Sequence, residues 1–584
     1  MSARHSGASR NPITDNLDLW TSALLIKSTA GRGNNGRLEA YGIKRLRELI
    51  LELAVRGKLL PQDPNDEPAA ELLKRVQSEK AKMIKNGKIK KEKDFPEIAE
   101  DEIPFDCPSG WQWVRINDVG HDFGQKTPNA KFTYIDVSAI DNSRGVIDVP
   151  TVLGASEAPS RARKIVQKGT VIYSTVRPYL KNICVLEQDY SPEPIASTAF
   201  AVLHPFQGMP GKFFTMYFRS PEFVRYVERV QTGIAYPAIN DKQFYGALVP
   251  VPTLEEQHRI VAKVDELMVL CDQLEQHQGR GIEAHQTLVE TLLGTLTNVE
   301  SAQEFAAAWN RIAEHFDTLF TTEHGIDQLK QTILQLAVMG KLVPQEPKDE
   351  PASVLLDKVT KTKKQKGREG RVKKNNLLPE VDYQDVPFNL PSSWKWARFG
   401  WLVNFKSELV RPEDFPDLDQ VAPDSIEKGT GNLLFRRTVS ESGVHGPNNK
   451  FYVGQILYSK IRPSLSKAVI AEFEGLCSAD MYPMDSMINS AYLLKVILSE
   501  PFLVQVRAAE NRIKMPKLNV ESLSNMIVPV PPLNEQRRIV AKVDELMALC
   551  DALKARLAEA QTTQIRLADA IVERAVAAPE AVVA

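Results

Sequence analysis

The chain has 584 residues, of which 43% are hydrophobic and 25% are charged, and its formal net charge is -1 at pH 7. This length is too great for one hydrophobic core and is enough for three or four domains, while the composition is that of an ordinary folded protein rather than a disordered one. The near-zero net charge argues against a protein that binds nucleic acid through overall electrostatic attraction.

The N-terminal stretch gives no sign of a targeting segment. No apolar run in the sequence reaches the roughly 18 residues that a membrane span needs, and residues 22–26 are too few for a signal peptide. We therefore expect a cytoplasmic protein. The glycines of GRGNNG at 31–36 match a phosphate-binding loop, but Arg37 and Leu38 stand where such a loop needs Lys and Ser or Thr, so the segment is interpreted as a flexible loop.

Two long segments of the sequence each occur twice. Residues 41–76 match residues 324–359 at 21 of 36 positions, and residues 249–275 match residues 528–554 at 21 of 27 positions. The chain is thus an internal duplication. The inserts between the matched blocks, residues 114–248 and 397–527, align only in scattered places, so two similar frames hold two different inserts.

Periodicity predicts that the repeated blocks are helices. Apolar residues recur at alternating spacings of four and three from Ile260 to Leu274 and from Ile539 to Ala560, which is a heptad pattern. A shorter helix in each copy is expected near residues 46–56 and 329–339, closed by Gly57 and Gly340. The pattern indicates a pseudo-twofold bundle or an antiparallel coiled coil.

Basic runs follow the first repeated block in both copies, at residues 80–93 and 358–374. They are interpreted either as solvated linkers or as arms that contact DNA phosphates.

The inserts read as mixed α/β domains. Each begins with Pro-Ser-x-Trp-x-Trp, at 108–113 and 391–396, and each contains Tyr-Ser-x-x-Arg-Pro after a predicted strand, at 173–178 and 458–463. Proline fixes a turn there, so the arginine is expected to project from the end of a strand. The segments TGIAYPAIN (232–240) and NRIKMPKLN (511–519) occupy equivalent loops before the long helices.

Catalytic and metal-binding patterns are missing from the sequence. The five cysteines lack CxxC spacing and are expected to be reduced core residues. The histidines show no metal-ligand spacing, and neither an Asn/Asp-Pro-Pro-aromatic element paired with a glycine-rich cofactor loop nor a nuclease carboxylate cluster stands out. We expect no catalytic residue and no metal site in this chain.

The sequences PPLNEQRRIV at 531–540 and PTLEEQHRIV at 252–261 carry a resemblance to a known family. Together with the duplicated frame, they resemble the specificity subunits of type I restriction-modification systems. The first motif departs from the pattern at Thr253, Glu255 and His258.

This resemblance implies a mixed α/β fold with two globular target-recognition domains in pseudo-twofold arrangement, separated by long helices that form an antiparallel coiled coil. The expected segments are a helical arm and basic linker (1–107), recognition domain 1 (108–253), a central helical spacer and linker (254–390), recognition domain 2 (391–532) and a C-terminal coiled-coil helix (533–584).

The resemblance also implies a non-catalytic protein that selects DNA. Each domain would read one half of an asymmetric bipartite target and direct partner subunits. The implied partners are double-stranded DNA, methyltransferase subunits expected to number two, and restriction or translocase subunits. S-adenosylmethionine, ATP and Mg are implied for those partners and no cofactor for this chain.

Cations in the inserts, with polar residues of the equivalent loops, are the candidate DNA contacts. A solvated surface charge, or a purely structural loop residue, is the alternative for each of them. Arg177 and Arg462 are favoured because both copies keep an arginine at that place. The candidates are Lys126, Lys131, Arg161, Arg163, Lys164, Arg177, Lys181, Tyr236 and Asn240 in the first insert, and Arg436, Arg437, Lys450, Lys460, Arg462, Lys467, Lys514, Lys517 and Asn519 in the second.

A second class of function stays open. The same architecture would serve a non-catalytic scaffold, with two domains on a coiled coil that recruit proteins, and the net charge of -1 suits it. A DNA reader should lose affinity steeply with salt, whereas a scaffold should not.

Overall fold

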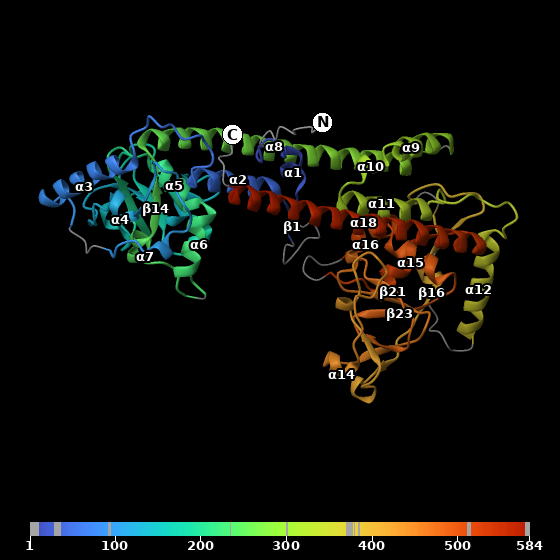
Figure 1. Ribbon diagram of the computed structural model, residues 1–584. Helices are drawn as coiled ribbons and strands as arrows, with labels where there is room; N and C mark the ends of the chain where they lie inside the picture. The colour runs from blue at the N-terminus through green and yellow to red at the C-terminus, as the bar shows by residue number, and fades with distance from the viewer. Residues whose placement is uncertain are drawn as a thin grey trace, which may run out of the picture. The chain divides into compact units, whose positions relative to one another are not determined.

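The chain divides into two units, each with one α/β domain and one set of packed helices (Figure 1). Unit 1 comprises Met1–Gly281 and Ala560–Ala584, and unit 2 comprises Ile282–Glu559. The computed structural model describes residues 11–27, 37–90, 95–233, 235–299, 302–368, 378, 380–382, 386–510 and 516–578. The glycines of the GRGNNG segment lie outside the described residues.

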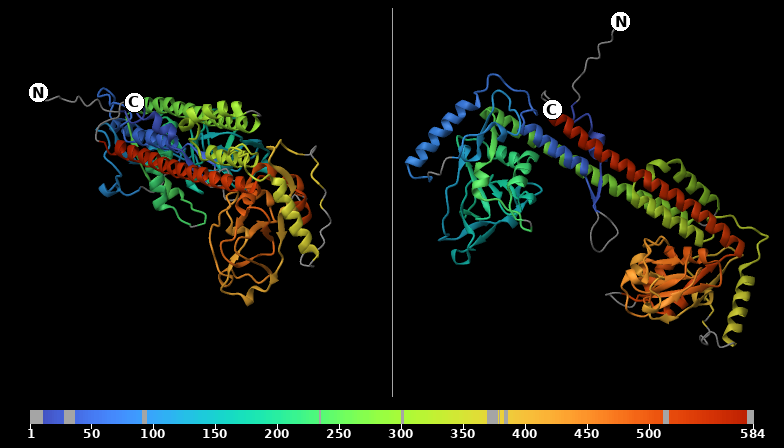
Figure 2. Two further views of the ribbon diagram at one scale, coloured as in Figure 1. Left: turned by 90° about the vertical axis from the view of Figure 1, so that its right-hand side faces the viewer. Right: turned by 60° about the horizontal axis from the view of Figure 1, so that its bottom comes forward.

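Helix α2 (Tyr41–Val55) is the centre of the helical part of unit 1. It packs against the first part of α8 (Leu254–Asn298) and the last part of α18 (Leu533–Ala577), as Figure 2 shows. The predicted seam is confirmed, because Ile260, Val264, Leu267 and Cys271 are all buried in this core. The short helix α1 (Leu17–Ser22) covers the start of α2, and β1 (Leu25–Lys27) pairs with β2 (Arg37–Glu39).

Ion pairs and hydrogen bonds fix the helix directions within unit 1. Arg47 of α2 binds Asp272 of α8, while Gln62 beyond the end of α2 reaches back to Glu256, so α2 and α8 run antiparallel. Tyr41 donates to Asp569 of α18 and Lys58 donates to the Val576 carbonyl, so α2 and α18 run parallel. Consequently α8 and α18 are antiparallel here, as predicted.

Unit 2 repeats this arrangement with the roles of the long helices exchanged. Helix α11 (Glu323–Val338) packs against the last part of α8 and the first part of α18, where Ile539, Val543 and Cys550 are buried. Lys330 pairs with Asp551, and Lys341 donates to the carbonyls of Thr297 and Val299 at the end of α8. Additional helices, α9 (Ala302–Glu314) and α10 (Phe316–Leu319), precede α11.

Glycines close the two central helices as predicted. Gly57 has φ +66° and Gly340 has φ +73°, a left-handed conformation that ends a helix without the steric cost of a side chain. A Cβ atom would also lie 2.4 Å from Pro108 at Gly57 and 2.6 Å from Pro391 at Gly340. Each glycine therefore lets the first proline of the α/β domain approach the frame.

The basic runs begin on helices rather than on linkers. Helix α3 spans Ala69–Lys85 and α12 spans Ala352–Arg368 (Figure 1), so both carry the basic residues in their second halves. Lys80 donates to the Asn117 carbonyl, and the equivalent Lys363 donates to the Val403 carbonyl. The basic runs are thus helical where they begin, and residues 91–94 and 369–374 lie outside the described residues. Whether they are solvated linkers or arms that contact DNA phosphates stays a prediction.

The two α/β domains share a mixed-sheet topology despite their divergent sequences. A first sheet has the order β11-β10-β13-β4 in domain 1 and β21-β20-β23-β16 in domain 2, and a short ribbon of β3 with β14, or β15 with β24, joins each domain to its frame. In the other sheet a central strand, β12 or β22, has one parallel and one antiparallel neighbour. The fourth strand differs, because β8 pairs with the parallel neighbour β5 whereas β17 pairs with the antiparallel neighbour β19.

The elements of domain 1, in chain order, are β3 Gln112–Arg115, α4 Ile116–Val119, β4 Gly120–His121, β5 Phe132–Ile135, β6 Ile140–Asp141, β7 Val146–Ile147, β8 Thr151–Leu153, β9 Ala162–Ile165, β10 Val171–Ser174, β11 Ile183–Val185, β12 Pro194–Ser197, β13 Phe200–Pro205, α5 Gly211–Arg219, α6 Pro221–Val230, α7 Asp241–Gly246 and β14 Leu248–Val251.

The elements of domain 2, in chain order, are β15 Lys395–Arg398, α13 Phe399–Leu402, β16 Val403–Phe405, β17 Leu409–Val410, β18 Asp419–Val421, α14 Val439–Ser442, β19 Asn448–Phe451, β20 Ile456–Ser459, β21 Ala468–Ile470, β22 Gly475–Ser478, β23 Met481–Ser486, α15 Ser490–Leu498, α16 Glu500–Ala509, α17 Val520–Asn525 and β24 Ile527–Val530. All five cysteines are free thiols, and four are buried.

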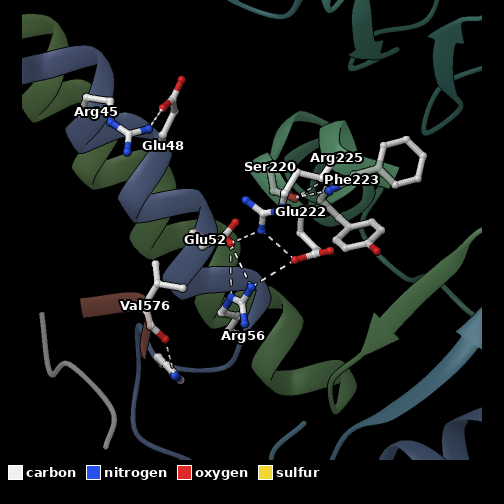
Figure 3. Close-up of polar contacts among 11 residues, drawn as sticks. Arg45, Glu48, Glu52, Arg56, Ser220, Glu222, Phe223, Arg225 and Val576 are labelled. Carbon is white, nitrogen blue, oxygen red and sulfur yellow. Dashed lines mark hydrogen bonds and ion pairs between the residues drawn. The ribbon is translucent and has the colours of Figure 1, made fainter. Parts of the chain in front are cut away.

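A cluster of four charges attaches domain 1 to α2 (Figure 3). Glu52 and Arg56 of α2 meet Glu222 and Arg225 of α6, with Arg56 3.1 Å from Glu222 and Arg225 2.7 Å from Glu52. The two carboxylates are almost fully buried. The equivalent positions of unit 2 are Gln335, Met339, Pro501 and Val504, none of which is charged.

We predict that Arg56→Met lowers the free energy of unfolding of the full chain by about 3 kcal/mol, because it leaves buried carboxylates short of a partner. Denaturant unfolding followed by circular dichroism measures this. Adding Glu222→Gln should restore part of the loss. The exposed pair Arg75–Glu67 provides the control, since Arg75→Met should cost less than about 1 kcal/mol; equal losses for both variants would contradict the prediction.

Candidate nucleic-acid interface

A buried glutamate in the first turn of each long helix holds the end of the α/β domain to the frame. Glu256 accepts hydrogen bonds from Trp111 Nε1 at 2.8 Å and from Gln62 Nε2 at 2.7 Å. In unit 2, Glu535 accepts from Gln345 Nε2 at 2.6 Å. Burial raises the pKa of both glutamates.

A half-buried arginine one turn later makes a second attachment. Arg259 pairs with Asp66 and Arg538 pairs with Asp349, and both aspartates lie in the loop after the central helix. The hydrogen bond from each arginine lowers the pKa of its aspartate. The Glu-Gln-x-Arg motif is thus a structural joint between the helix and the frame.

The Tyr-Ser-x-x-Arg-Pro segments form the same strained turn in both domains. Arg177 has φ +48° and Arg462 has φ +45°, and four residues later Lys181 and Ser466 are also left-handed. Among the described residues, five that are not glycine have positive φ, and four of them lie in these two turns. A left-handed residue with a side chain costs about 1–2 kcal/mol, so two matching strained turns indicate a shared constraint at this place.

Each turn is held by the loop that precedes the long helix. The backbone N–H of Arg177 donates to the Pro237 carbonyl at 2.8 Å, and that of Arg462 donates to the Pro516 carbonyl at the same distance. The buried prolines, Pro178 and Pro463, fix the turn from inside, and both arginine side chains are exposed. The structure therefore brings the predicted turn and the predicted loop together in each domain.

Arg177 and Tyr236 form the centre of this surface in domain 1. The guanidinium lies 4.8 Å from the centroid of the tyrosine ring, a cation–π distance. Lys181, at the other end of the turn, is half-buried, and burial lowers its pKa. Asn240 caps helix α7 by accepting from the Gln243 N–H at 2.9 Å.

The other candidates of domain 1 lie outside this centre. Lys131 and Arg161 are exposed, and Arg163 donates to the Ala162 carbonyl. Lys126 pairs with Glu193. Lys164 is buried and pairs with Asp122 at 2.7 Å and Asp241 at 3.4 Å, so its ammonium group belongs to the domain interior.

Carboxylates and aromatic rings accompany the candidates of domain 2. Lys517 lies 3.2 Å and Lys460 3.8 Å from Asp480, beside the turn of Arg462. Asn519 caps α17 as Asn240 caps α7. Lys514 lies outside the described residues.

Four more candidates of domain 2 lie on other elements. Arg436 stacks 3.9 Å above Phe473 and pairs with Asp419. Arg437 pairs with Asp424, and Lys450 lies 5.4 Å from the ring centroids of Phe415 and Tyr452. Lys467 donates to the Pro423 carbonyl, and burial lowers its pKa.

Sequence reasoning missed Tyr179 and Leu180, which follow Arg177 in the turn and are 54% and 38% exposed. Their position directly after the Arg-Pro pair was the available signal. Within the part of the chain that the structure describes, no cluster of acidic, histidine or cysteine side chains fits a metal ion, and no helix is long and apolar enough to cross a membrane.

Comparison with known proteins decides the family. A model of the type I restriction modification DNA specificity domain matches residues 108–284 and 436–561. The EcoAI specificity subunit of a type I restriction enzyme from Escherichia coli is 39% identical, over 97% of this chain and 99% of its own length. The chain belongs to the type I restriction-modification specificity subunits. The EcoEI specificity subunit, also from Escherichia coli, is 37% identical over 96% of this specificity subunit and 99% of its own length.

Solved structures from type I systems have a weaker likeness. A chain from a structure describing complex assembly and conformational transition of the type I R-M system has a TM-score of 0.48 and 23% identity, over 81% of this specificity subunit and 99% of that chain. The HsdS subunit from Thermoanaerobacter tengcongensis has a TM-score of 0.43 and 24% identity, over 81% and 98%.

We predict that Asp66→Asn lowers the unfolding free energy of the specificity subunit by about 1–2 kcal/mol at pH 7, because a charged hydrogen bond to Arg259 is lost. A carboxyl whose pKa is lowered by folding stabilises the fold above its usual value near 3.8 and loses that contribution as the pH falls through the lowered pKa. The difference from the parent chain should therefore shrink as the pH falls below 3.8 and through the lowered pKa, as seen by denaturant unfolding across pH. Asp349→Asn should behave alike, and a difference that stayed constant with pH would contradict this.

Proposed function

We propose that this specificity subunit binds double-stranded DNA through both α/β domains and that each domain reads one half of an asymmetric bipartite target. The subunit would carry this choice to two methyltransferase subunits and to restriction subunits. The observation that carries the proposal is the strained turn of Arg177 and Arg462, which recurs at one place in both domains while the side chains around it differ.

The two domains share the backbone conformation of the turn and differ in the side chains around it, and this combination suits the reading of DNA. Contacts to the sugar-phosphate backbone position a protein on the duplex, and contacts to base edges specify the sequence. Two equal frames would place both domains in the same way, and unlike residues beside Arg177 and Arg462 would select different bases. Arginine is well suited because two of the five N–H donors of its guanidinium can bind a guanine edge or a phosphate together.

We also propose that the subunit is not itself an enzyme. The sequence has no paired elements for binding a methyl donor and carrying out methyl transfer, so S-adenosylmethionine, ATP and Mg would be bound by the partner subunits. Catalysis would then require assembly. A protein-recruiting scaffold is the competing class of function, and it would show neither base preference nor steep salt dependence.

Arg177→Gly and Arg462→Gly test the two turns separately. Glycine suits positive φ, so stability should hold or rise while DNA affinity falls about tenfold or more. Methylation mapping with partner methyltransferase subunits should show weakened or relaxed reading of one half-site for Arg177→Gly and of the other for Arg462→Gly. The control is Arg280→Ala, at an exposed position on helix α8, because a glycine there would perturb the helix. This variant should leave the reading of both half-sites unchanged.

Loss of both halves in either single variant would contradict separate reading by the two domains. Unchanged affinity in both variants would exclude the turns from the DNA surface. Arg177→Lys separates the two kinds of contact, because lysine keeps the charge but lacks the planar fork needed to bind guanine with two hydrogen bonds.

Exchange of one whole insert gives a further prediction. Replacing residues 114–248 by the corresponding insert of the EcoAI specificity subunit should change one half of the methylated sequence and leave the other half intact, since the frame contacts of residues 249–275 are retained. The readout is genome-wide mapping of methylated adenines with the partner subunits present. The specificity subunit alone, assayed in parallel, should produce no methylation, and a change in both halves would contradict the modular reading.

A further inference from the structure

Four exposed apolar side chains lie on the turn of Arg177 and on the loop bonded to that turn. Tyr236 is 67% exposed, Tyr179 54%, Val176 39% and Leu180 38%. Exposed apolar residues are normally scattered over a surface, and a cluster of them with two aromatic rings indicates a site that is covered when the protein is at work.

The backbone holds this cluster rigidly. Val176 forms a β-bridge with Ala238, and the Arg177 N–H bond to Pro237 ties the loop of Tyr236 to the turn. From the other side, Asn142 Nδ2 donates to the Leu180 carbonyl at 2.8 Å. The tyrosine at position 179 is therefore presented on a preorganised turn, so little backbone entropy is lost when the ring is buried by a ligand.

Among the described residues of domain 2, which leave out residues 511–515, the same turn occurs without this cluster. Ser464 stands where domain 1 has Tyr179, and the equivalents of Val176 and Leu180, Ile461 and Leu465, are half-buried. Lys517 beside this turn is paired with Asp480. The exposed apolar residues on the turn itself are thus a property of domain 1 and not of the shared turn conformation.

We propose that Tyr179 and Tyr236 are stacking residues that insert against base faces in the half-site read by domain 1 and unstack one base step there. This inference rests on the proposed DNA-reading function and adds a mechanism to it. The faces of the bases are the large apolar surfaces of DNA, and they become available only when a step opens. Arg177, 4.8 Å from the Tyr236 ring, supplies the positive charge that holds the adjacent backbone or a guanine edge.

The proposal also gives the two half-sites different physical requirements. The half read by domain 1 should contain a pyrimidine–purine step, which unstacks most easily, at a position where the sequence preference comes from deformability. The half read by domain 2 should remain stacked, because its turn offers a serine and paired cations.

The test uses the full chain assembled with its methyltransferase subunits, on duplexes of the mapped target with 2-aminopurine placed at successive positions. Fluorescence of this base analogue rises when it unstacks. We expect a rise at one step of the domain 1 half-site for the parent chain and for Tyr179→Phe, and loss of that rise for Tyr179→Ala. Binding by Tyr179→Ala should also weaken by about tenfold or more, as for the loss of one base–aromatic stack.

Two controls separate unstacking by this chain from other effects. A signal at the methylated adenine that is equal in all variants would come from the methyltransferase subunits. Trp309→Ala, at another exposed aromatic residue, on α9, should alter neither fluorescence nor affinity. Tyr236→Ala and Tyr236→Phe repeat the comparison for the second ring.

Several results would overturn the proposal. A fluorescence pattern independent of Tyr179 would exclude insertion of this ring between bases. Weaker DNA binding by Tyr179→Ala with no change in base stacking would exclude it as well. Loss of methyltransferase assembly with unchanged DNA binding would assign the cluster to a protein contact. Absence of any sequence-specific DNA binding by the parent complex would instead refute the proposed function itself. The insertion of the tyrosines would then be refuted too.

Discussion

The arrangement depends on a buried carboxylate at the start of each long helix. Glu256 and Glu535 lie where a domain ends, a 45-residue helix begins and the loop of the central helix returns. A buried carboxylate is costly unless donors surround it, so side-chain donors from separate segments must converge at this point. The negative charge in the first turn also suits the helix dipole. This requirement explains why the Glu-Gln-x-Arg motif is repeated, whereas the domain surfaces are not.

Inside the domains, too, a backbone feature is shared while the side chains around it differ. Arg177 and Arg462 adopt a conformation that costs free energy, and both are held in it by a carbonyl from the following loop. The constraint acts on the backbone, so it fixes where side chains are presented and leaves their chemistry free. Tyr179 and Ser464 can therefore stand at equivalent positions. The attachment to the frame has diverged in a similar way, with four charges at α2 in unit 1 and uncharged residues in unit 2.

Sequence periodicity was sufficient for the frame and insufficient for the surfaces. The heptad from Ile260 to Cys271 and the glycine at position 57 predicted helices, seam and helix end, because burial and backbone conformation are local demands. The pattern left a helical bundle and a coiled coil open, and that α2 packs against both α8 and α18 could not be decided from it, since this requires contacts between segments far apart in the chain. Among the candidate contacts, the burial of Lys164 beside Asp122 and Asp241 could not be inferred, because a lysine in a strand looks the same whether it faces solvent or an acidic pair.

For the proposed DNA-reading surface, the pairing of cations with carboxylates is in keeping with the chain's net charge of -1. Lys517, Arg436 and Arg437 each lie beside an aspartate, so a phosphate would have to displace a carboxylate that is already bound. Such displacement reduces the general attraction to DNA that drives non-specific binding. DNA sites that match the protein in shape and in base edges would gain affinity relative to all other DNA sites. Under the proposed function, weak general affinity for DNA would favour discrimination, because selectivity is set by the ratio of specific to non-specific binding.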